Sequence, residues 1–258
     1  MHLEEITPLI LTFNEAANLP RVLPRLVWAR DIVVVDSGST DGTLEILAGY
    51  PQVRVVSRAF DTFACQCNFG LEQVRTEWML SLDADYVPGD DFENELATLD
   101  ANAGGYRVTF RYCVLGQPLR ASLYPSRTVL YRRELARYVD EGHGHRVVVD
   151  GEIQTLHTRF DHDDRKPLQR WFQSQIRYAE METAHLLASP ADSLNRPDRI
   201  RRWIFVAPAL VFFYTLLIKG LILDGLPGWH YVMQRTLAEL ILSLQLLHRR
   251  LEGDAPKS

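Results

Sequence analysis

The stretches IVVVDSGSTDGT (residues 32–43) and WMLSLDADY (residues 78–86) predict the fold of this chain. In each, four or more largely apolar residues run directly into carboxylates, as in a buried parallel strand that delivers acidic side chains to the edge of a sheet. Asp83 and Asp85 would repel each other unless a cation lies beside them. A divalent cation bridging a diphosphate meets this need, so the pattern predicts a nucleotide-sugar and metal site. The alternative is that these are turn or helix-capping aspartates of an ordinary α/β fold.

Strands and helices alternate through the first hundred residues. We expect strands at residues 6–13, 32–35, 53–56 and 78–82, and helices at residues 14–26, 43–48 and 67–75. This alternation is typical of βαβ units, and it predicts an α/β fold with a parallel sheet. The second and fourth strands then end at the same edge of the sheet, where ligands bind.

After Pro88 the pattern changes to α+β. Further strands are expected at residues 105–116, 127–133 and 146–151, and a helix at residues 167–187. We interpret residues 1–190 as one domain, with a nucleotide-sugar-binding half at residues 1–100 and an acceptor half at residues 101–190.

Residues 191–258 are predicted to form a helical segment that associates with a membrane or forms an interface. The run WIFVAPALVFFYTLLI (residues 203–218) is uncharged but shorter than the ~20 residues of a spanning helix, and Pro208 would kink it. Four arginines precede it, which suits an anionic membrane face. A turn at residues 223–229 and a last apolar-striped helix complete an apolar helical hairpin. A buried hairpin or a homodimer interface through residues 203–251 is the alternative.

Composition restricts the partners and the compartment. The chain has 28 Lys and Arg against 33 Asp and Glu, a net charge of −5, so no basic field favours nucleic acid. Three cysteines are too few for a disulfide framework or a four-ligand zinc site. The N-terminal stretch is acidic where a signal peptide would be basic. We expect a cytoplasmic protein that associates peripherally with the inner face of the cell membrane.

The carboxylates predict the chemistry of sugar transfer. When a sugar leaves a nucleoside diphosphate, negative charge grows on the diphosphate, and Mn²⁺ or Mg²⁺ offsets it as a Lewis acid. Asp85 is the better candidate for direct ligation, and Asp83 could share the metal, hold a metal-bound water or bind the ribose. Asp36 is placed to accept hydrogen bonds from the base or ribose, while residues 39–41 could equally cap the next helix.

An inverting transferase also needs a general base near the acceptor hydroxyl. Glu141 is the first choice because it begins the glycine-flanked loop EGHGH, and Asp140 is the second. His143 and His145 are either ligands for metal or phosphate, or ordinary surface residues.

The stretch HDDRK (residues 162–166) is densely charged. It forms either a lid in which Arg165 and Lys166 neutralise the diphosphate, or a solvated helix start capped before Pro167. Arg127 is a further acceptor-side candidate.

Four motifs in this order, TFNEAANL, VVVDSGSTDGT, QCNFGL and SLDAD, resemble the family 2 glycosyltransferases with the GT-A fold, a Rossmann-like nucleotide-diphospho-sugar transferase fold. The resemblance covers the first third of the chain. It implies that Asp36 binds the nucleotide, that the Asp-x-Asp motif binds the sugar-nucleotide and Mn²⁺ or Mg²⁺, and that one in-line displacement inverts the sugar. It also implies two groups of nucleotide-sugar-binding residues: Thr12, Asn14 and Glu15 in the nucleoside pocket, and Gln66 and Asn68 at the base, the ribose or neighbouring carboxylates.

The second half resembles bacterial lipopolysaccharide-core β-glucosyltransferases more loosely, through YPSRTVLYRR, EGHGHRVVVDG, HDDRKPL and KGLILDGLPG. Relatives of this type often carry a His-Glu pair where this chain has Gly144 and His145.

These observations together predict a metal-dependent inverting glycosyltransferase. It would move a hexose, with glucose the first guess, from a UDP-sugar to a saccharide or lipid-linked acceptor in cell-envelope glycan synthesis. An Asp-x-Asp phosphohydrolase would carry the pair on the first strand, and a sugar-nucleotide pyrophosphorylase would need a glycine-rich basic loop in place of LTFNEAANLP. A catalytically impaired nucleotide-binding membrane scaffold is the non-enzymatic alternative.

Overall fold

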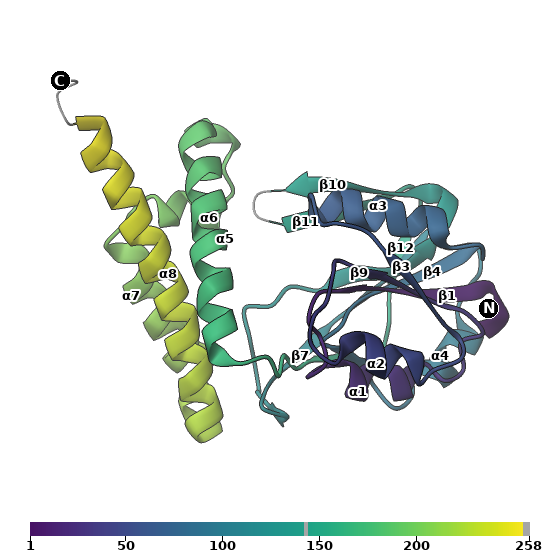
Figure 1. The fold of residues 1–258 in the computed structure, drawn as a ribbon. Helices are drawn as coiled ribbons and strands as arrows, with labels where there is room; N and C mark the ends of the chain where they lie inside the picture. The colour runs from purple at the N-terminus through teal and green to yellow at the C-terminus, as the bar shows by residue number, and fades with distance from the viewer. Residues whose placement is uncertain (142–143, 255–258) are drawn as a thin grey trace. The chain divides into compact units, whose positions relative to one another are not determined.

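The computed structural model describes residues 1–141 and 144–254 (Figure 1). The chain divides into two compact units. The first comprises Met1–Pro118 and Tyr124–Lys166, and the second comprises Leu119–Leu123 and Pro167–Ser258.

A mixed sheet forms the centre of the first unit. In the described residues it has seven strands, in the order β12 (Ile153–Thr155), β6 (Gly105–Val108), β9 (Arg127–Arg132), β4 (Trp78–Asp83), β1 (Ile6–Thr12), β2 (Ile32–Asp36) and β3 (Val53–Ser57). β4, β1, β2 and β3 run parallel, and β9 is antiparallel to β4 and β6. The apolar runs of β1 and β2 are buried because both faces of the sheet are covered.

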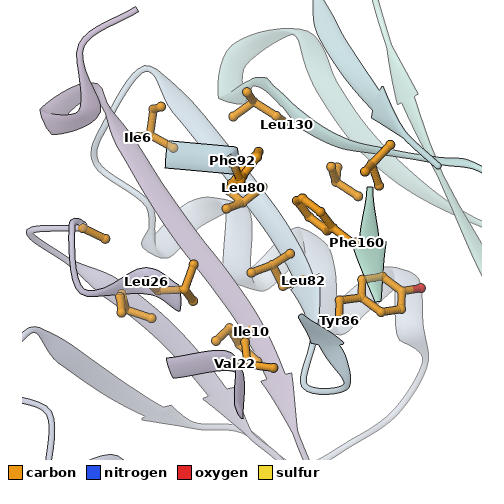
Figure 2. Packing of buried hydrophobic residues seen from close by; sticks show 14 of the residues in the cluster. Ile6, Ile10, Val22, Leu26, Leu80, Leu82, Tyr86, Phe92, Leu130 and Phe160 are labelled. Atoms are coloured by element: carbon orange, nitrogen blue, oxygen red, sulfur yellow. The ribbon is translucent and has the colours of Figure 1, made fainter. Parts of the chain in front are cut away.

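Two layers cover the sheet. One face packs against α1 (Leu19–Val22), the 3₁₀ turn η2 (Leu23–Leu26), α2 (Thr43–Ala48) and α4 (Phe92–Thr98). The other packs against α3 (Phe63–Gln73) and the two-stranded ribbon of β10 (Ala136–Glu141) and β11 (Gly144–Val149). Figure 2 shows part of the first core, where Ile10 of β1 and Leu80 and Leu82 of β4 gather with Val22 and Phe160. Short 3₁₀ turns, η1 (Leu3–Glu5) and η3 (Arg133–Leu135), precede β1 and β10.

A smaller sheet brings distant segments together. Its described strands are ordered β5 (Tyr86–Pro88), β13 (Phe160–His162), β7 (Phe110–Val114) and β8 (Gln117–Pro118). β13 pairs antiparallel with β5, with His162 opposite Tyr86. Residues at the end of β13 therefore lie beside the segment that follows β4.

The second unit is helical. Its elements are α5 (Leu168–Ala188), η4 (Ala191–Ser193), α6 (Arg196–Arg201), α7 (Val206–Phe213), the π-helical turn η5 (Tyr214–Ile218), η6 (Leu221–Asp224) and α8 (Gly225–Asp254). α5 and α7 both pack against α8 (Figure 1). Arg201 lies among three largely buried carboxylates, with N–O distances of 3.1 Å to each of Glu182, Asp198 and Glu239. This ion cluster joins α5, α6 and α8.

Within the described residues, none of the helices taken singly has the length and hydropathy of a membrane span. One bent pair, Val206–Ile218 with Leu221–Gly253, has them jointly, and its two parts meet at an angle of 67°.

The structure departs from the sequence predictions in several places, and α3 begins four residues before the helix predicted at residues 67–75. Residues 14–18 are not helical; the helix begins at Leu19, because Asn14 adopts a left-handed backbone with φ 57°. The strand predicted at residues 105–116 divides into β6 and β7, which join different sheets. The turn predicted at residues 223–229 is also wrong, because α8 begins at Gly225 and Pro227 occupies its first turn, where proline is tolerated.

The boundary between the compact units also differs from the predicted division after residue 190. α5 packs with α8 and belongs to the second unit, so the units part between Lys166 and Pro167. The functional division into donor, acceptor and membrane-associating parts stays a prediction.

Candidate active site

The predicted carboxylates gather at one edge of the sheet. β1 lies between β2 and β4, with Thr12 opposite Asp36 and Leu11 opposite Asp83. Asp85 follows two residues later, in the turn between β4 and β5. The prediction that the second and fourth strands deliver their carboxylates to one edge is therefore confirmed.

Asp36 is buried and holds its own turn together. Its Oδ1 accepts hydrogen bonds from Thr12 Oγ1 at 2.8 Å and Ser39 Oγ at 2.5 Å. Its Oδ2 accepts from the amides of Gly38 and Ser39, both at 2.9 Å. Burial pushes the pKa of Asp36 upward, but the hydrogen bonds from Ser39, Thr12 and Gly38 outweigh it, so the pKa lies below its ordinary value. Asp36 thus shapes the loop, and its contact with a base or ribose stays a prediction.

Replacing Asp36 by asparagine should lower the free energy of unfolding by about 2 kcal/mol at pH 7, since charge-assisted hydrogen bonds are lost. The folded-state pKa is depressed, so this stabilisation is present above the unfolded-state pKa of about 3.9 and is lost as pH falls through the folded-state value. Urea unfolding of both proteins at neutral and acid pH measures the difference. A gap that stays constant down to pH 3 would contradict the role of the charge.

Asn14 ties the loop after β1 to the loop after β2. Its Oδ1 accepts from the amides of Thr40 at 2.7 Å and Asp41 at 3.3 Å, and its own amide donates to Ser39 Oγ at 2.8 Å. Asparagine is one of the few residues that tolerates its left-handed backbone. Thr12 and Asn14 therefore build the loop assigned to the nucleoside.

Asp85 is buried with an unsatisfied oxygen. Its Oδ2 lies 3.3 Å from Nε2 of His162, whereas its Oδ1 is buried and has no hydrogen-bond partner among the described residues. Burial would raise the pKa of Asp85, but the positive charges of His162 and Lys166 overcome it and the pKa is lowered. An ionised oxygen buried without a donor is costly, so this site is suited to a further cation.

His162 is a site residue that the sequence reasoning missed. The pairing of β13 with β5 places it against Asp85, and burial, which would lower the pKa of His162, is outweighed by that carboxylate, so the pKa is raised. Its ring packs against Tyr124, Tyr112 and Tyr86, with centroid distances of 4.2, 4.8 and 5.5 Å. The only cue in the sequence was the motif HDDRKPL, because the strand pairing is not a local pattern.

Asp83 is exposed at the end of β4 and lies within electrostatic range of Tyr86 and Tyr124. Arg127 of β9 lies with its guanidinium carbon 5.6 Å from the centre of the Tyr124 ring. Burial would lower the pKa of Arg127, but Tyr124, Tyr86 and Asp83 raise it above its ordinary value. The structure thus brings the candidate Arg127 to the site.

The arrangement of these carboxylates bears on the predicted metal site. In the part of the chain that the structure describes, no group of three His, Cys, Asp or Glu side chains is arranged to hold an ion. Mg²⁺ and similar cations are commonly held by one or two carboxylates together with substrate phosphates and water. The unsatisfied Oδ1 of Asp85 and the exposed Asp83 fit that donor set.

Glu15 and Lys166 form a buried ion pair near Asp85. Lys166 Nζ donates to Glu15 Oε1 at 2.8 Å, and Asn18 Nδ2 donates to Glu15 Oε2 at 2.8 Å. Burial raises the pKa of Glu15 to about 7, although Lys166 acts in the opposite direction. Burial would lower the pKa of Lys166, but Glu15, Asp85 and Asp164 raise it, so the ammonium stays charged. Glu15 therefore pairs with Lys166 of the same chain.

Arg165 lies differently from the expected lid. Its guanidinium pairs with Asp163 at 2.8 Å, and its amide donates to Asn18 Oδ1 at 2.8 Å. Lys166, in contrast, is within electrostatic range of Asp85. The structure therefore places the charge of Lys166, rather than that of Arg165, close to Asp85.

Gln66 and Asn68, both on α3, contact neighbouring protein segments. Gln66 Nε2 donates to Ser37 Oγ at 2.8 Å and Arg58 O at 3.2 Å. Asn68 Nδ2 donates to Tyr138 O at 3.0 Å, and its Oδ1 accepts from Tyr138 N at 2.9 Å. Asn68 thus fixes β10 to α3, and the expected contacts of both residues with the base, the ribose or neighbouring carboxylates stay a prediction.

The candidate bases lie at the end of β10. Asp140 is exposed, and its Oδ1 accepts from Ala64 N, in the first turn of α3, at 3.3 Å. Glu141 ends the strand, but its side chain and that of His145 lie outside what the structure describes, as does His143 entirely. The choice between Glu141 and Asp140 stays a prediction.

Comparisons with known proteins agree with this geometry. The model of the family described as glycosyl transferase family 2 matches residues 9–147. A lipopolysaccharide core biosynthesis glycosyltransferase, LpsC, of Rhizobium meliloti (strain 1021) is 26% identical over 95% of this chain and 92% of its own length. An uncharacterized glycosyltransferase of Rickettsia bellii is 30% identical over 38% of this chain and 34% of its own length.

Among solved structures, a mannosyltransferase of Pyrobaculum calidifontis in complex with GDP-Man and Mn²⁺ is similar in fold. Its TM-score is 0.55 at 17% identity, over 94% of this chain and 87% of that one.

Proposed function

The chain belongs to glycosyl transferase family 2, and on this basis we propose that it is a metal-dependent inverting hexosyltransferase that uses a UDP-sugar, with UDP-glucose the first candidate. Its fold is the predicted α/β GT-A fold, with long helices at the C-terminal end. The similarity to LpsC supports a saccharide acceptor in lipopolysaccharide core synthesis.

One observation carries the metal-dependent part of the proposal. The Oδ1 of Asp85 is buried without a hydrogen-bond partner among the described residues, and it lies two residues from the exposed Asp83. A divalent cation held there supplies Lewis-acid neutralisation of the leaving diphosphate. Lys166 adds a fixed positive charge, and His162 orients Asp85.

The aromatic residues beside this edge suit an acceptor pocket. Tyr86, Tyr112 and Tyr124 surround the His162 ring, and the Tyr86 and Tyr124 hydroxyls are hydrogen-bonded to each other. Tyr86 is buried, whereas the half-buried rings of Tyr112 and Tyr124 offer apolar faces with polar ends, which suits binding of a sugar. The reaction is proposed to take place at the cytoplasmic membrane face, with association through residues 191–258; a homodimer through residues 203–251 is the alternative.

A panel of UDP-, GDP- and dTDP-sugars tests donor and metal together. At a donor concentration one hundred times Kd, binding should stabilise the protein by about 2.7 kcal/mol and raise Tm by several degrees, for UDP-glucose with Mn²⁺ and not after chelation. Thermal unfolding with each sugar measures this. A larger shift from a GDP- or dTDP-sugar would refute the donor, and an equal shift without metal would refute the metal requirement.

A further inference from the structure

The second unit exposes an unusual concentration of large apolar side chains around the junction of α7 and α8. The exposed members between residues 203 and 233 are Trp203, Phe205, Val206, Leu210, Phe213, Tyr214, Leu217, Ile218, Ile222, Leu223, Leu226, Trp229 and Met233. We call residues 203–233 the elbow. Soluble monomers rarely expose contiguous apolar surface of this kind unless it meets a partner.

The elbow is a built structure rather than a frayed helix end. Gly220, with φ 71°, allows the chain to turn between η5 and η6, and the two helical parts meet at 67°. A Cβ on Gly228 would lie 2.0 Å from the carbonyl oxygen of Leu221, so η6 packs directly on α8. Ala207, Leu216 and Val232 are buried inside the unit, so the exposed residues occupy its outer side.

Residues 119–123, which we call the strap, fix the bend. Arg120 donates to Asp224 through its amide at 3.0 Å and its Nε at 2.8 Å. Leu123 donates its amide to the hydroxyl of the buried Tyr231 at 2.7 Å. The strap thus clamps η6 and α8 at the apex of the elbow.

The charges around the elbow indicate which kind of partner it contacts. Residues 196–235 contain six basic and two acidic side chains, in a chain whose net charge is −5, and one of the six, Arg201, is already neutralised by Glu182, Asp198 and Glu239. Both acids are engaged within the unit, Asp198 by Arg201 and Asp224 by Arg120. Arg196 and Arg199 are exposed, and Lys219 Nζ lies 5.7 Å from the centre of the Tyr214 ring. Apolar side chains edged by tryptophan, tyrosine and basic residues match the headgroup region of an anionic bilayer.

We infer that the elbow inserts into one leaflet of an anionic lipid surface, with its bend set by the strap before it binds. This inference rests on the proposed function, because a membrane-bound acceptor gives the insertion its purpose. The acceptor class that goes with insertion into a leaflet is a saccharide carried on a lipid.

Flotation with vesicles of phosphatidylcholine, with and without phosphatidylglycerol, tests the inference on the full chain. The wild type should float with the anionic vesicles, less so at high salt. A triple variant, Phe205→Ser, Ile218→Ser and Leu226→Ser, should bind about tenfold more weakly or worse. These side chains are 79%, 75% and 84% exposed, so the fold should survive their loss. The matched control carries Leu187→Ser, Leu244→Ser and Leu251→Ser, exposed leucines of the same unit outside the elbow, and should float like the wild type.

Arg120→Ala removes no apolar side chain but loosens the clamp, so it should weaken vesicle binding several-fold, and Arg120→Lys should restore part of it. Equal flotation of the elbow variant and the wild type would overturn the inference. The inference would also be overturned if the wild type did not bind vesicles and instead sedimented as a dimer that the elbow variant abolishes. The elbow would then be covered by a second copy of the chain. Donor-induced thermal shifts of the same proteins report separately on the proposed function, because they need no vesicle.

Discussion

Asp85→Asn should lower the turnover of sugar transfer by about 10³-fold while the protein stays folded. Asparagine has the same shape and keeps a hydrogen bond to His162, but it removes the negative charge at the buried Oδ1. Without that charge, the site should lose affinity for the divalent cation, and the leaving diphosphate loses its main electrostatic stabilisation. UDP release with a truncated lipopolysaccharide core as acceptor, measured across a Mn²⁺ titration, gives both the turnover and the metal dependence.

The control for this change is Asp90→Asn. Asp90 is a strongly exposed carboxylate paired with Arg25, and its loss should leave turnover within a factor of about two because exposed ion pairs contribute little. If Asp85→Asn retains full turnover with Mn²⁺, the carboxylate is not a metal ligand and the assignment of the Asp-x-Asp pair fails.

The sequence predicted the strands that deliver the carboxylates because their signal is local. β2 and β4 are apolar runs that end in Asp36 and Asp83, and a buried strand with an acidic end can be recognised within a few residues. The same reasoning failed for His162, whose place depends on β13 pairing with β5. No periodicity in the chain reports that pairing.

The sequence pattern also could not show which carboxylate each of two neighbouring basic residues contacts. Arg165 and Lys166 were treated alike, yet Arg165 pairs with Asp163 whereas Lys166 reaches Glu15 and the field of Asp85. Consecutive side chains on an irregular segment point in different directions, and only tertiary contacts decide which carboxylate each meets.

The prediction of a helix at residues 14–18 is wrong for a related reason. Its composition suits a helix, but Asn14 bonds the amides of Thr40 and Asp41 across the loop, and this tertiary contact overrides local propensity. The glycines and proline at residues 225–228 illustrate the opposite error, because a composition typical of turns lies inside the first turn of α8.

Glu141→Gln should reduce sugar transfer by about 10²- to 10⁴-fold while UDP-glucose binding and Tm remain unchanged, because a general base acts on the acceptor and not on the donor. We expect Glu141 rather than its neighbour to be the base because the Asp140 carboxylate already accepts a hydrogen bond within the protein. Asp140 Oδ1 accepts from the amide of Ala64 at the start of α3, where a carboxylate is favoured by the helix dipole. Asn68 fixes the backbone of β10 at Tyr138, in the same strand as Asp140 and Glu141.

Asp140→Asn is the matched control, since an amide oxygen can still accept from Ala64, and its transfer rate should stay within a few-fold of the wild type. Single-turnover UDP release, with donor binding measured on the same samples, separates loss of chemistry from loss of binding. The opposite ranking, with Asp140→Asn inactive and Glu141→Gln active, would transfer the role to Asp140. Full activity of both variants would show that the base lies on another element. The residues around His162 would then be the next candidates, because His162 contacts Asp85.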